Sequence, residues 1–100
     1  MKALLVAREA EADLDEIWSF IDRREDSPSR ADSVVSELAQ RFVVIASAPS
    51  IGKRQDHIEP GMRSLPVGNY VVYYRETGEH VLIMRVVHAA RSKRNIFGVD

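Results

Sequence analysis

Two stretches of the chain repeat apolar residues three and four positions apart, which is the spacing of one helix face. The first predicts a helix over about residues 8–25, on Ala10, Leu14, Ile17, Trp18 and Ile21. The second predicts a longer helix that ends at Pro49, on Ala31, Val34, Val35, Leu38, Phe42 and Ile45. Between them, Ser27 can cap the second helix and Pro28 suits its first position. Because this turn is short, the helices should form an antiparallel hairpin.

Shorter apolar and β-branched runs predict strands at residues 2–7, 62–67, 70–75 and 81–87. Gly68-Asn69 and Thr77-Gly78-Glu79 are turn signals, and they join the last three strands into an antiparallel meander. The run 81–87 is apolar on both faces, as expected of a central strand. Pro66 suits an edge strand, since it cannot donate to a ladder. Residues 49–61 have no periodicity and are expected to be loop.

The elements therefore follow in the order β–α–α–β–β–β. We expect residues 1–100 to form one α+β domain, with the helical hairpin packed on one face of a small, mostly antiparallel sheet. The opposite face of the sheet is expected to stay open, where it could bind another macromolecule.

Composition removes several classes of function. The chain has no cysteine, so it can form neither a disulfide nor a thiolate metal site. The histidines His57, His80 and His88 lack metal-ligand spacing, and no glycine-rich phosphate loop is present. We therefore expect no metal and no cofactor. The apolar run at the N-terminus is too short for a signal peptide or a membrane span, so a soluble cytoplasmic protein without membrane association is expected.

The net charge of −1 argues against a strongly basic nucleic-acid binder, but the charge is uneven along the chain. Residues 1–50 hold six basic and ten acidic side chains, which gives −4, and residues 51–100 hold eight and five, which gives +3. The basic half could face an acidic partner or a phosphate backbone, or it could be an ordinary solvated surface. The acidic residues of the first helix, Glu9, Asp13, Asp15 and Glu16, are expected to lie mainly on its solvated face.

Among the arginines inside predicted strands, two are candidate functional residues. Arg63 lies in the second strand, and Arg85 interrupts an otherwise apolar run. Arginine is rarely buried without a partner, so Arg85 could pair with an acidic residue or lie at a sheet margin. Alternatively, both guanidinium groups could line a groove on the open face. A basic cluster follows the last strand and comprises His88, Arg91, Lys93 and Arg94.

Such a groove could cleave RNA only if it held phosphate with cations and moved protons at the 2′-hydroxyl and the leaving oxygen. Among these residues His88 alone has an ordinary pKa suited to that role. A ribonuclease would therefore use His88 with Arg63, Arg85 and Arg91. Tyr70, Tyr73 and Tyr74 also lie on strands, where tyrosines usually serve in packing.

Short segments along nearly the whole chain form a combined pattern. They are Ala12-Asp13-Leu14 with Ile17 and Ile21, Phe42, Ala48-Pro49 with Gly52, Gly61-Met62-Arg63, Tyr70-Val71-Val72-Tyr73-Tyr74-Arg75, and Ile83 followed by residues 85–91. The most specific is the last, an arginine, two aliphatic residues, a histidine, two small residues and an arginine, from Arg85 to Arg91. In order and spacing these segments resemble the RelE/ParE toxin superfamily, and the ParE plasmid-stabilisation branch most closely.

The resemblance implies the toxin of a type II toxin–antitoxin pair, neutralised by a small ParD-like antitoxin. ParE proteins are associated with poisoning DNA gyrase, whereas RelE proteins cut mRNA on the ribosome. Val71 stands where some RelE-type enzymes have arginine, and Phe97 at the late aromatic position has no hydroxyl. The lysine pair expected on the second strand is also missing. These departures favour a gyrase inhibitor that acts by binding; the alternatives are a ribosome-dependent mRNA endonuclease and an inactive member that only binds antitoxin.

Overall fold

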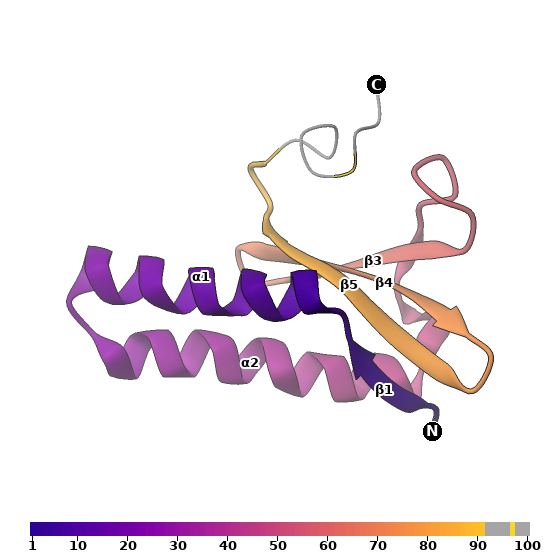
Figure 1. Cartoon of the computed structure of the whole chain (residues 1–100), viewed down its shortest axis with the longest axis horizontal. Coiled ribbons are helices and arrows are strands. Elements are labelled where there is room, and N and C mark those ends of the chain that lie inside the picture. Colours follow the sequence, from indigo (N-terminus) through magenta and orange to yellow (C-terminus); the bar gives the residue numbers. More distant parts are fainter. Residues whose placement is uncertain (92–96, 98–100) are drawn as a thin grey trace.

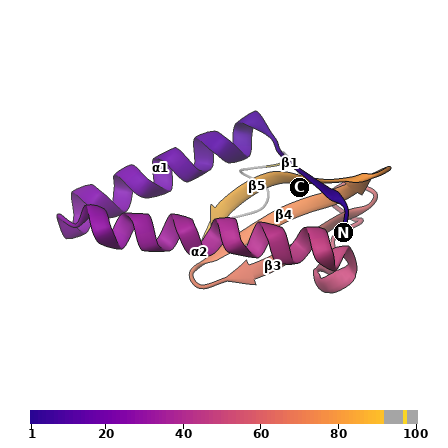
Figure 2. The same ribbon diagram turned by 90° about the horizontal axis from the view of Figure 1, so that it is seen from below.

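The computed structural model describes residues 1–91 and residue 97, and it places two helices over one face of a five-stranded sheet (Figures 1 and 2). The helices are α1 (Arg8–Glu25) and α2 (Pro28–Ser47). A short 3₁₀ turn, η1, follows at Pro49–Ile51. The strands are β1 (Ala3–Val6), β2 (Lys53–Arg54), β3 (Met62–Val67), β4 (Tyr70–Thr77) and β5 (His80–His88). The predicted α+β class and its order of two helices and four main strands are confirmed.

The sheet has the strand order β1-β5-β4-β3-β2. The last three main strands form the predicted antiparallel meander, and β1 pairs in parallel with β5. β5 lies between β1 and β4, so the prediction of a central strand at 81–87 is confirmed. The prediction that residues 49–61 are wholly loop is wrong, because η1 and β2 fall inside this range. A two-residue strand is too short to show an alternating pattern, which is why the sequence did not reveal it.

The helical hairpin is held by local signals that the sequence contains. The Ser27 side chain accepts a hydrogen bond from the Arg30 N–H (3.2 Å), and Pro28 takes the first helical position. Asp26 ends α1 in the left-handed conformation, with φ of 50°. Along the hairpin, Trp18 donates to the Asp32 carboxylate (2.8 Å) and joins the two helices. In Figure 1 both helices extend beyond the strands toward the turn that connects them.

The main core lies between the hairpin and the sheet. Its buried side chains come from both helices and from the three long strands, and include Ile17, Leu38, Phe42, Val72 and Ile83. Burial of these apolar surfaces is the main force that fastens the helices to the sheet. No helix in the described ranges is long and apolar enough to cross a membrane.

The other face of the sheet is less open than the sequence suggested. Met62, Tyr73 and Val87 are buried there in a second apolar cluster, with Ile58 and Phe97 packed against it. The Tyr73 and Phe97 rings meet edge to face at 5.0 Å. Both helices lie on the opposite side (Figure 2), so this face is covered in part by residues outside the helices and strands.

Candidate binding site at the end of strand β5

Asp13 joins α1 to the outer edge of β5. Its carboxylate accepts two hydrogen bonds from the Arg85 guanidinium, from Nε at 2.8 Å and from Nη2 at 2.9 Å. It also accepts one from the Val86 backbone N–H at 2.9 Å. The expectation that Asp13 lies on the solvated face of the helix is wrong, since the residue is 7% exposed. Helical spacing cannot show this, because the surface that buries Asp13 comes from the far end of the chain.

Arg85 is thus held inside the fold by an acidic partner. The hydrogen bonds that Arg85 donates to Asp13 raise the pKa of Arg85, although partial burial acts in the opposite direction. A paired arginine was one of the two interpretations that the sequence left open. With its guanidinium fork filled by one carboxylate, Arg85 has little capacity left to hold a ligand.

Arg63 is engaged elsewhere. Its Nη1 donates to the Gly52 carbonyl (2.8 Å), while its backbone pairs with Arg54 of β2 and Tyr74 of β4. His88 pairs with Tyr70, four residues along β4 from Tyr74. Arg63 and His88 are therefore separated by about 13 Å along the strands, at ~3.3 Å per residue. The structure does not bring them together.

A buried tyrosine fastens the segment between α2 and β3. The Tyr74 hydroxyl donates to the Pro49 carbonyl (2.7 Å) and accepts from the Gly52 N–H (2.8 Å). Desolvation raises the Tyr74 pKa, and the hydrogen bond from Gly52 lowers it to a smaller extent. The sequence placed Tyr74 in the packing of the sheet but gave no sign of these contacts, which join residues more than 20 positions apart.

His88 and Arg91 lie where β5 ends. The His88 ring meets the Tyr70 ring edge to face at 5.5 Å, and its Nδ1 accepts from the Ala90 N–H (3.1 Å). Both residues are exposed. Lys93 and Arg94, the other members of the expected basic cluster, lie outside the described residues.

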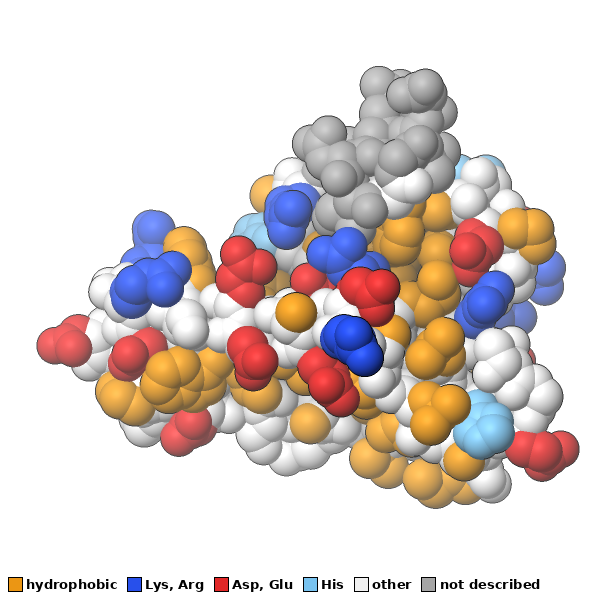
Figure 3. Space-filling view, viewed as in Figure 1, with side chains coloured by type: hydrophobic (Ala, Val, Ile, Leu, Met, Phe, Trp, Pro, Cys, Tyr) orange, Lys and Arg blue, Asp and Glu red, His pale blue; other side chains and the backbone are white. Residues whose placement is uncertain are grey.

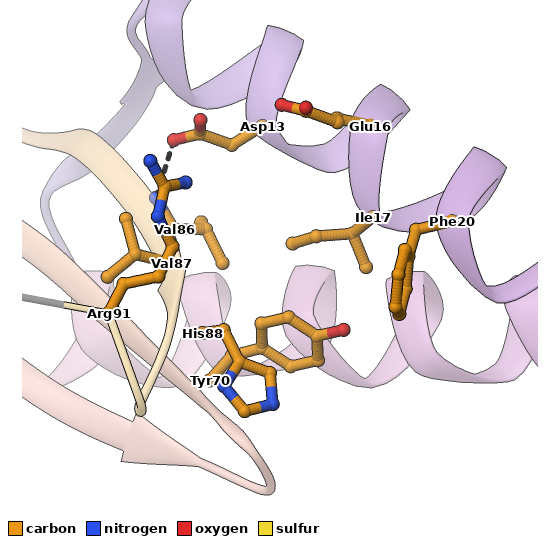
Figure 4. Close-up of a pocket in the computed structure, with 9 residues that line it drawn as sticks. All are labelled: Asp13, Glu16, Ile17, Phe20, Tyr70, Val86, Val87, His88 and Arg91. Atoms are coloured by element: carbon orange, nitrogen blue, oxygen red, sulfur yellow. Dashed lines mark hydrogen bonds between the residues drawn. The ribbon is translucent and has the colours of Figure 1, made fainter. Parts of the chain in front are cut away.

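A hollow of about 230 Å³ lies between α1 and the end of β5 (Figure 4). Apolar side chains of Ile17, Phe20, Tyr70, Val86 and Val87 form most of its lining, and Asp13, Glu16, His88 and Arg91 supply polar groups. In Figure 4 the Arg91 side chain extends from the end of the strand toward Asp13. The hollow therefore combines an apolar lining with a mixed polar rim, which suits a protein segment better than a phosphate chain.

Sequence reasoning found two residues of this hollow and missed the rest. His88 and Arg91 were candidates because of their charge. Phe20 was missed, although its place outside the apolar stripe of the first helix was a usable signal. It is 47% exposed in the structure. A large aromatic side chain left outside the core is a common mark of a binding surface.

On the face that Figure 3 shows, charge is mixed. Figure 3 shows acidic and basic side chains interspersed along α1, with apolar side chains gathered over the strands beside it. This face carries no field of one sign that would attract a nucleic-acid backbone.

Comparison with known proteins identifies the family. Residues 4–93 match the family described as the ParE toxin of the type II toxin–antitoxin system parDE. The chain belongs to the ParE toxin family. It is thus a toxin component of a type II toxin–antitoxin system and a member of the wider RelE/ParE superfamily, as the sequence pattern predicted.

Relatives of similar length support this membership. Toxin ParE1 of Caulobacter vibrioides is 35% identical over 98 residues, which cover 98% of this chain and 100% of that protein. Toxin ParE1 of Mycobacterium tuberculosis is 35% identical over 85 residues, 84% of this ParE chain and 86% of that one.

Solved structures share the fold. A chain of the chromosomal ParDE system of P. aeruginosa superposes with a TM-score of 0.76 at 23% identity, covering 88% of this ParE chain and 96% of that chain. The isolated E. coli RelE toxin superposes with a TM-score of 0.64 at 18% identity, covering 96% and 93%. At these identities the likeness concerns the fold alone, and it does not separate gyrase inhibition from RNA cleavage.

Proposed function

We propose that this ParE toxin inhibits DNA gyrase by binding it, without catalysis of its own, and that a ParD-like antitoxin neutralises it. The observation that carries the proposal is the use of the strand arginines. The Arg85 fork is filled by Asp13, and Arg63 is held at the Gly52 carbonyl, about 13 Å along the strands from His88 at ~3.3 Å per residue, so the two strand arginines do not form one phosphate site with His88.

The remaining groups give weak support to nuclease chemistry. A cleaving site needs an acid, a base and phosphate-holding cations within hydrogen-bond reach of one another. Of the four residues that a ribonuclease would use, only His88 and Arg91 share the hollow at the end of β5. Phe97 packs on Tyr73 and has no hydroxyl with which to transfer a proton.

Exposed apolar side chains on both helices support the antitoxin part of the proposal. Phe20 on α1 and Val43 and Val44 on α2 are 47%, 47% and 38% exposed. An antitoxin segment with an amphipathic helix could cover them, in the manner of other helix-in-groove complexes. Folding of that segment on the toxin would bury apolar surface that the toxin exposes alone.

A gyrase supercoiling assay tests the toxic activity. Purified toxin should inhibit supercoiling of relaxed plasmid and accumulate cleaved DNA, and prior addition of the protein encoded by the adjacent reading frame should restore the activity. A His88→Ala, Arg91→Ala variant should inhibit less, while Arg41→Ala, an exposed change on α2, serves as its control. Unchanged supercoiling with no cleaved DNA would remove gyrase as the target.

Primer extension on translated messages separates gyrase inhibition from RNA cleavage. A gyrase inhibitor leaves the 5′ ends of messages unchanged after induction, whereas a ribosome-dependent endonuclease creates new ones. If new ends arise and His88→Ala reduces them by about 100-fold, the share usual for a general acid or base, the toxin is an enzyme. Normal growth on expression without antitoxin would instead indicate an inactive member.

A further inference from the structure

The two edges of the sheet differ in their side chains. β2 forms one edge and consists of Lys53 and Arg54, both exposed, so charge opposes the addition of another strand there. β1 forms the other edge and reads Ala-Leu-Leu-Val, with neither a charged residue nor a proline (Figure 1). Such residues commonly protect an edge strand, because its unpaired N–H and C=O groups bond readily to another chain. The β1 edge lacks this protection.

Hydrogen bonds fix which backbone groups of β1 face outward. The Ala3 and Ala7 N–H groups donate to carbonyls on the β5 side, at 3.0 and 2.9 Å. Successive residues of a strand present their backbone groups to opposite edges. The N–H and C=O groups of Leu4 and Val6 therefore face away from β5.

These outward groups have no partner in the described part of the chain. Helix α2 reaches this edge at its start, where the Lys2 N–H donates to the Ala46 carbonyl (3.1 Å). Beyond that point β1 pairs with β5 alone, and no helix, turn or loop of the described residues bonds to the outward groups of Leu4 and Val6. Two donors and two acceptors are therefore left for a second strand.

The side chain between these two residues is also uncovered. Leu4 and Val6 pack against the main core beneath the helices, so Leu5 projects to the other face of the sheet. It is 46% exposed and pairs with Leu82 of β5, which projects to the same face. An apolar stripe therefore crosses β5 and β1 and stops at the open edge.

We propose that β1 pairs with β1 of a second copy of this chain, antiparallel about a two-fold axis at Leu5. Leu4 of each copy lies opposite Val6 of the other, and the two residues of each such pair exchange both N–H···O=C bonds. This register satisfies every outward group of Leu4 and Val6. The two Leu5 side chains meet across the axis and join the two apolar stripes into one.

A second copy fits this edge because the segment is complementary to itself. A two-fold interface repeats each contact, and it places the same residues opposite one another in reverse order. From residue 3 to residue 7 every side chain is apolar, so no like charges oppose each other in the pair. Of the charged residues on either side, Lys2 is bound to Glu76 (3.3 Å) and Arg8 already belongs to α1.

The pairing leaves the candidate binding site accessible. No residue of β1 lines the hollow between α1 and the end of β5. The dimer therefore carries two copies of that hollow, and the inference does not depend on gyrase being the target.

Sedimentation equilibrium of the purified toxin tests the association. The apparent mass should rise from that of one chain toward that of two as the concentration increases from about 1 to about 500 µM, the range expected of a small interface. A mass of one chain throughout this range would overturn the proposal.

Opposite charges at Leu5 test the two-fold register. Leu5→Lys and Leu5→Glu should each weaken self-association by at least about tenfold, because like charges then meet across the axis. An equal mixture of the two variants should dimerise again, since opposite charges then meet. Ile51→Lys is the matched control, because Ile51 is 48% exposed and lies in η1, which precedes the opposite edge strand β2. It should associate like the wild type.

Amide hydrogen exchange of wild-type toxin decides the matter even if these variants fold poorly. The Leu4 and Val6 N–H groups should exchange at least about tenfold more slowly where the dimer predominates than in the monomer. If a dimer forms while these two amides exchange at unchanged rates, another surface joins the copies and the proposal is wrong. A mixture of folded Leu5→Lys and Leu5→Glu proteins that stays monomeric would also overturn it.

Discussion

At the residue scale, the buried Asp13 carboxylate joins α1 to β5. It satisfies three donors at once, two from Arg85 and the Val86 N–H, and it takes the place of a strand on β5. Charged groups that leave water are stable only when each hydrogen-bonding position is filled. Because this contact joins α1 to the end of β5, it also sets the width of the hollow between them.

Replacing Asp13 should therefore destabilise the fold more than most surface changes. Asp13→Ala leaves Arg85 unpaired and the Val86 N–H without its acceptor, and should lower the free energy of unfolding by about 3 kcal/mol. Urea denaturation followed by circular dichroism measures the change. The double variant Asp13→Leu, Arg85→Met should lose less than the sum of the two single changes, since no lone charge remains. Additive losses would show that the two side chains act separately.

At the element scale, the two helices and the four main strands could be predicted from the sequence, and η1 and β2 could not. The helices follow from repeated apolar spacing and from the Ser27-Pro28 start, which are local signals. β2 pairs through Lys53 and Arg54 alone, and its position depends on contacts with β3. His88 and Arg91 could be singled out by charge, and Phe20 by its place outside the apolar stripe of the first helix. Asp13 gained its role only from a surface distant in sequence, because its partners lie on β5.

The segment that contains η1 and β2 depends on Gly52, and a substitution there tests how the segment is held. A Cβ at Gly52 would lie 2.5 Å from the Tyr74 hydroxyl oxygen and 2.9 Å from the Ser64 carbonyl oxygen. Gly52→Ala should therefore cost about 2 kcal/mol of stability, as overpacking of a tight site does, and thermal unfolding would show it. Adding Tyr74→Phe removes the closer atom, so the double variant should lose less than the two changes summed. A Gly52→Ala protein as stable as the wild type would contradict this account.

At the scale of the whole molecule, all three long strands contribute to both apolar clusters, and β4 does so with neighbouring tyrosines. β4 places Tyr74 in the main core beneath the helices and Tyr73 in the cluster on the other face. Tyr70 lies between the main core and the hollow at the end of β5. Stability of the fold and shape of the candidate site are therefore tied to the same strand.

Stability should fall at alkaline pH because burial raises the pKa of Tyr70, Tyr73 and Tyr74 above the ordinary value of 10.0. Below about pH 10 the folded and the unfolded chain both keep the phenol protons of these tyrosines, so the full stability is present. Above it the unfolded chain loses protons that the folded chain retains, so the free energy of unfolding falls as pH rises toward the folded pKa values.

Urea denaturation at several pH values between about 9 and 11, on either side of the ordinary pKa of tyrosine, measures the slope of the unfolding free energy against pH. Tyrosinate absorbance follows ionisation of the phenols. Tyr73→Phe should reduce the slope, because it removes one of the three groups while retaining the ring contact with Phe97. Tyrosines that ionise in the folded protein as free tyrosine does, with stability constant across this range, would show that β4 does not bury its phenols.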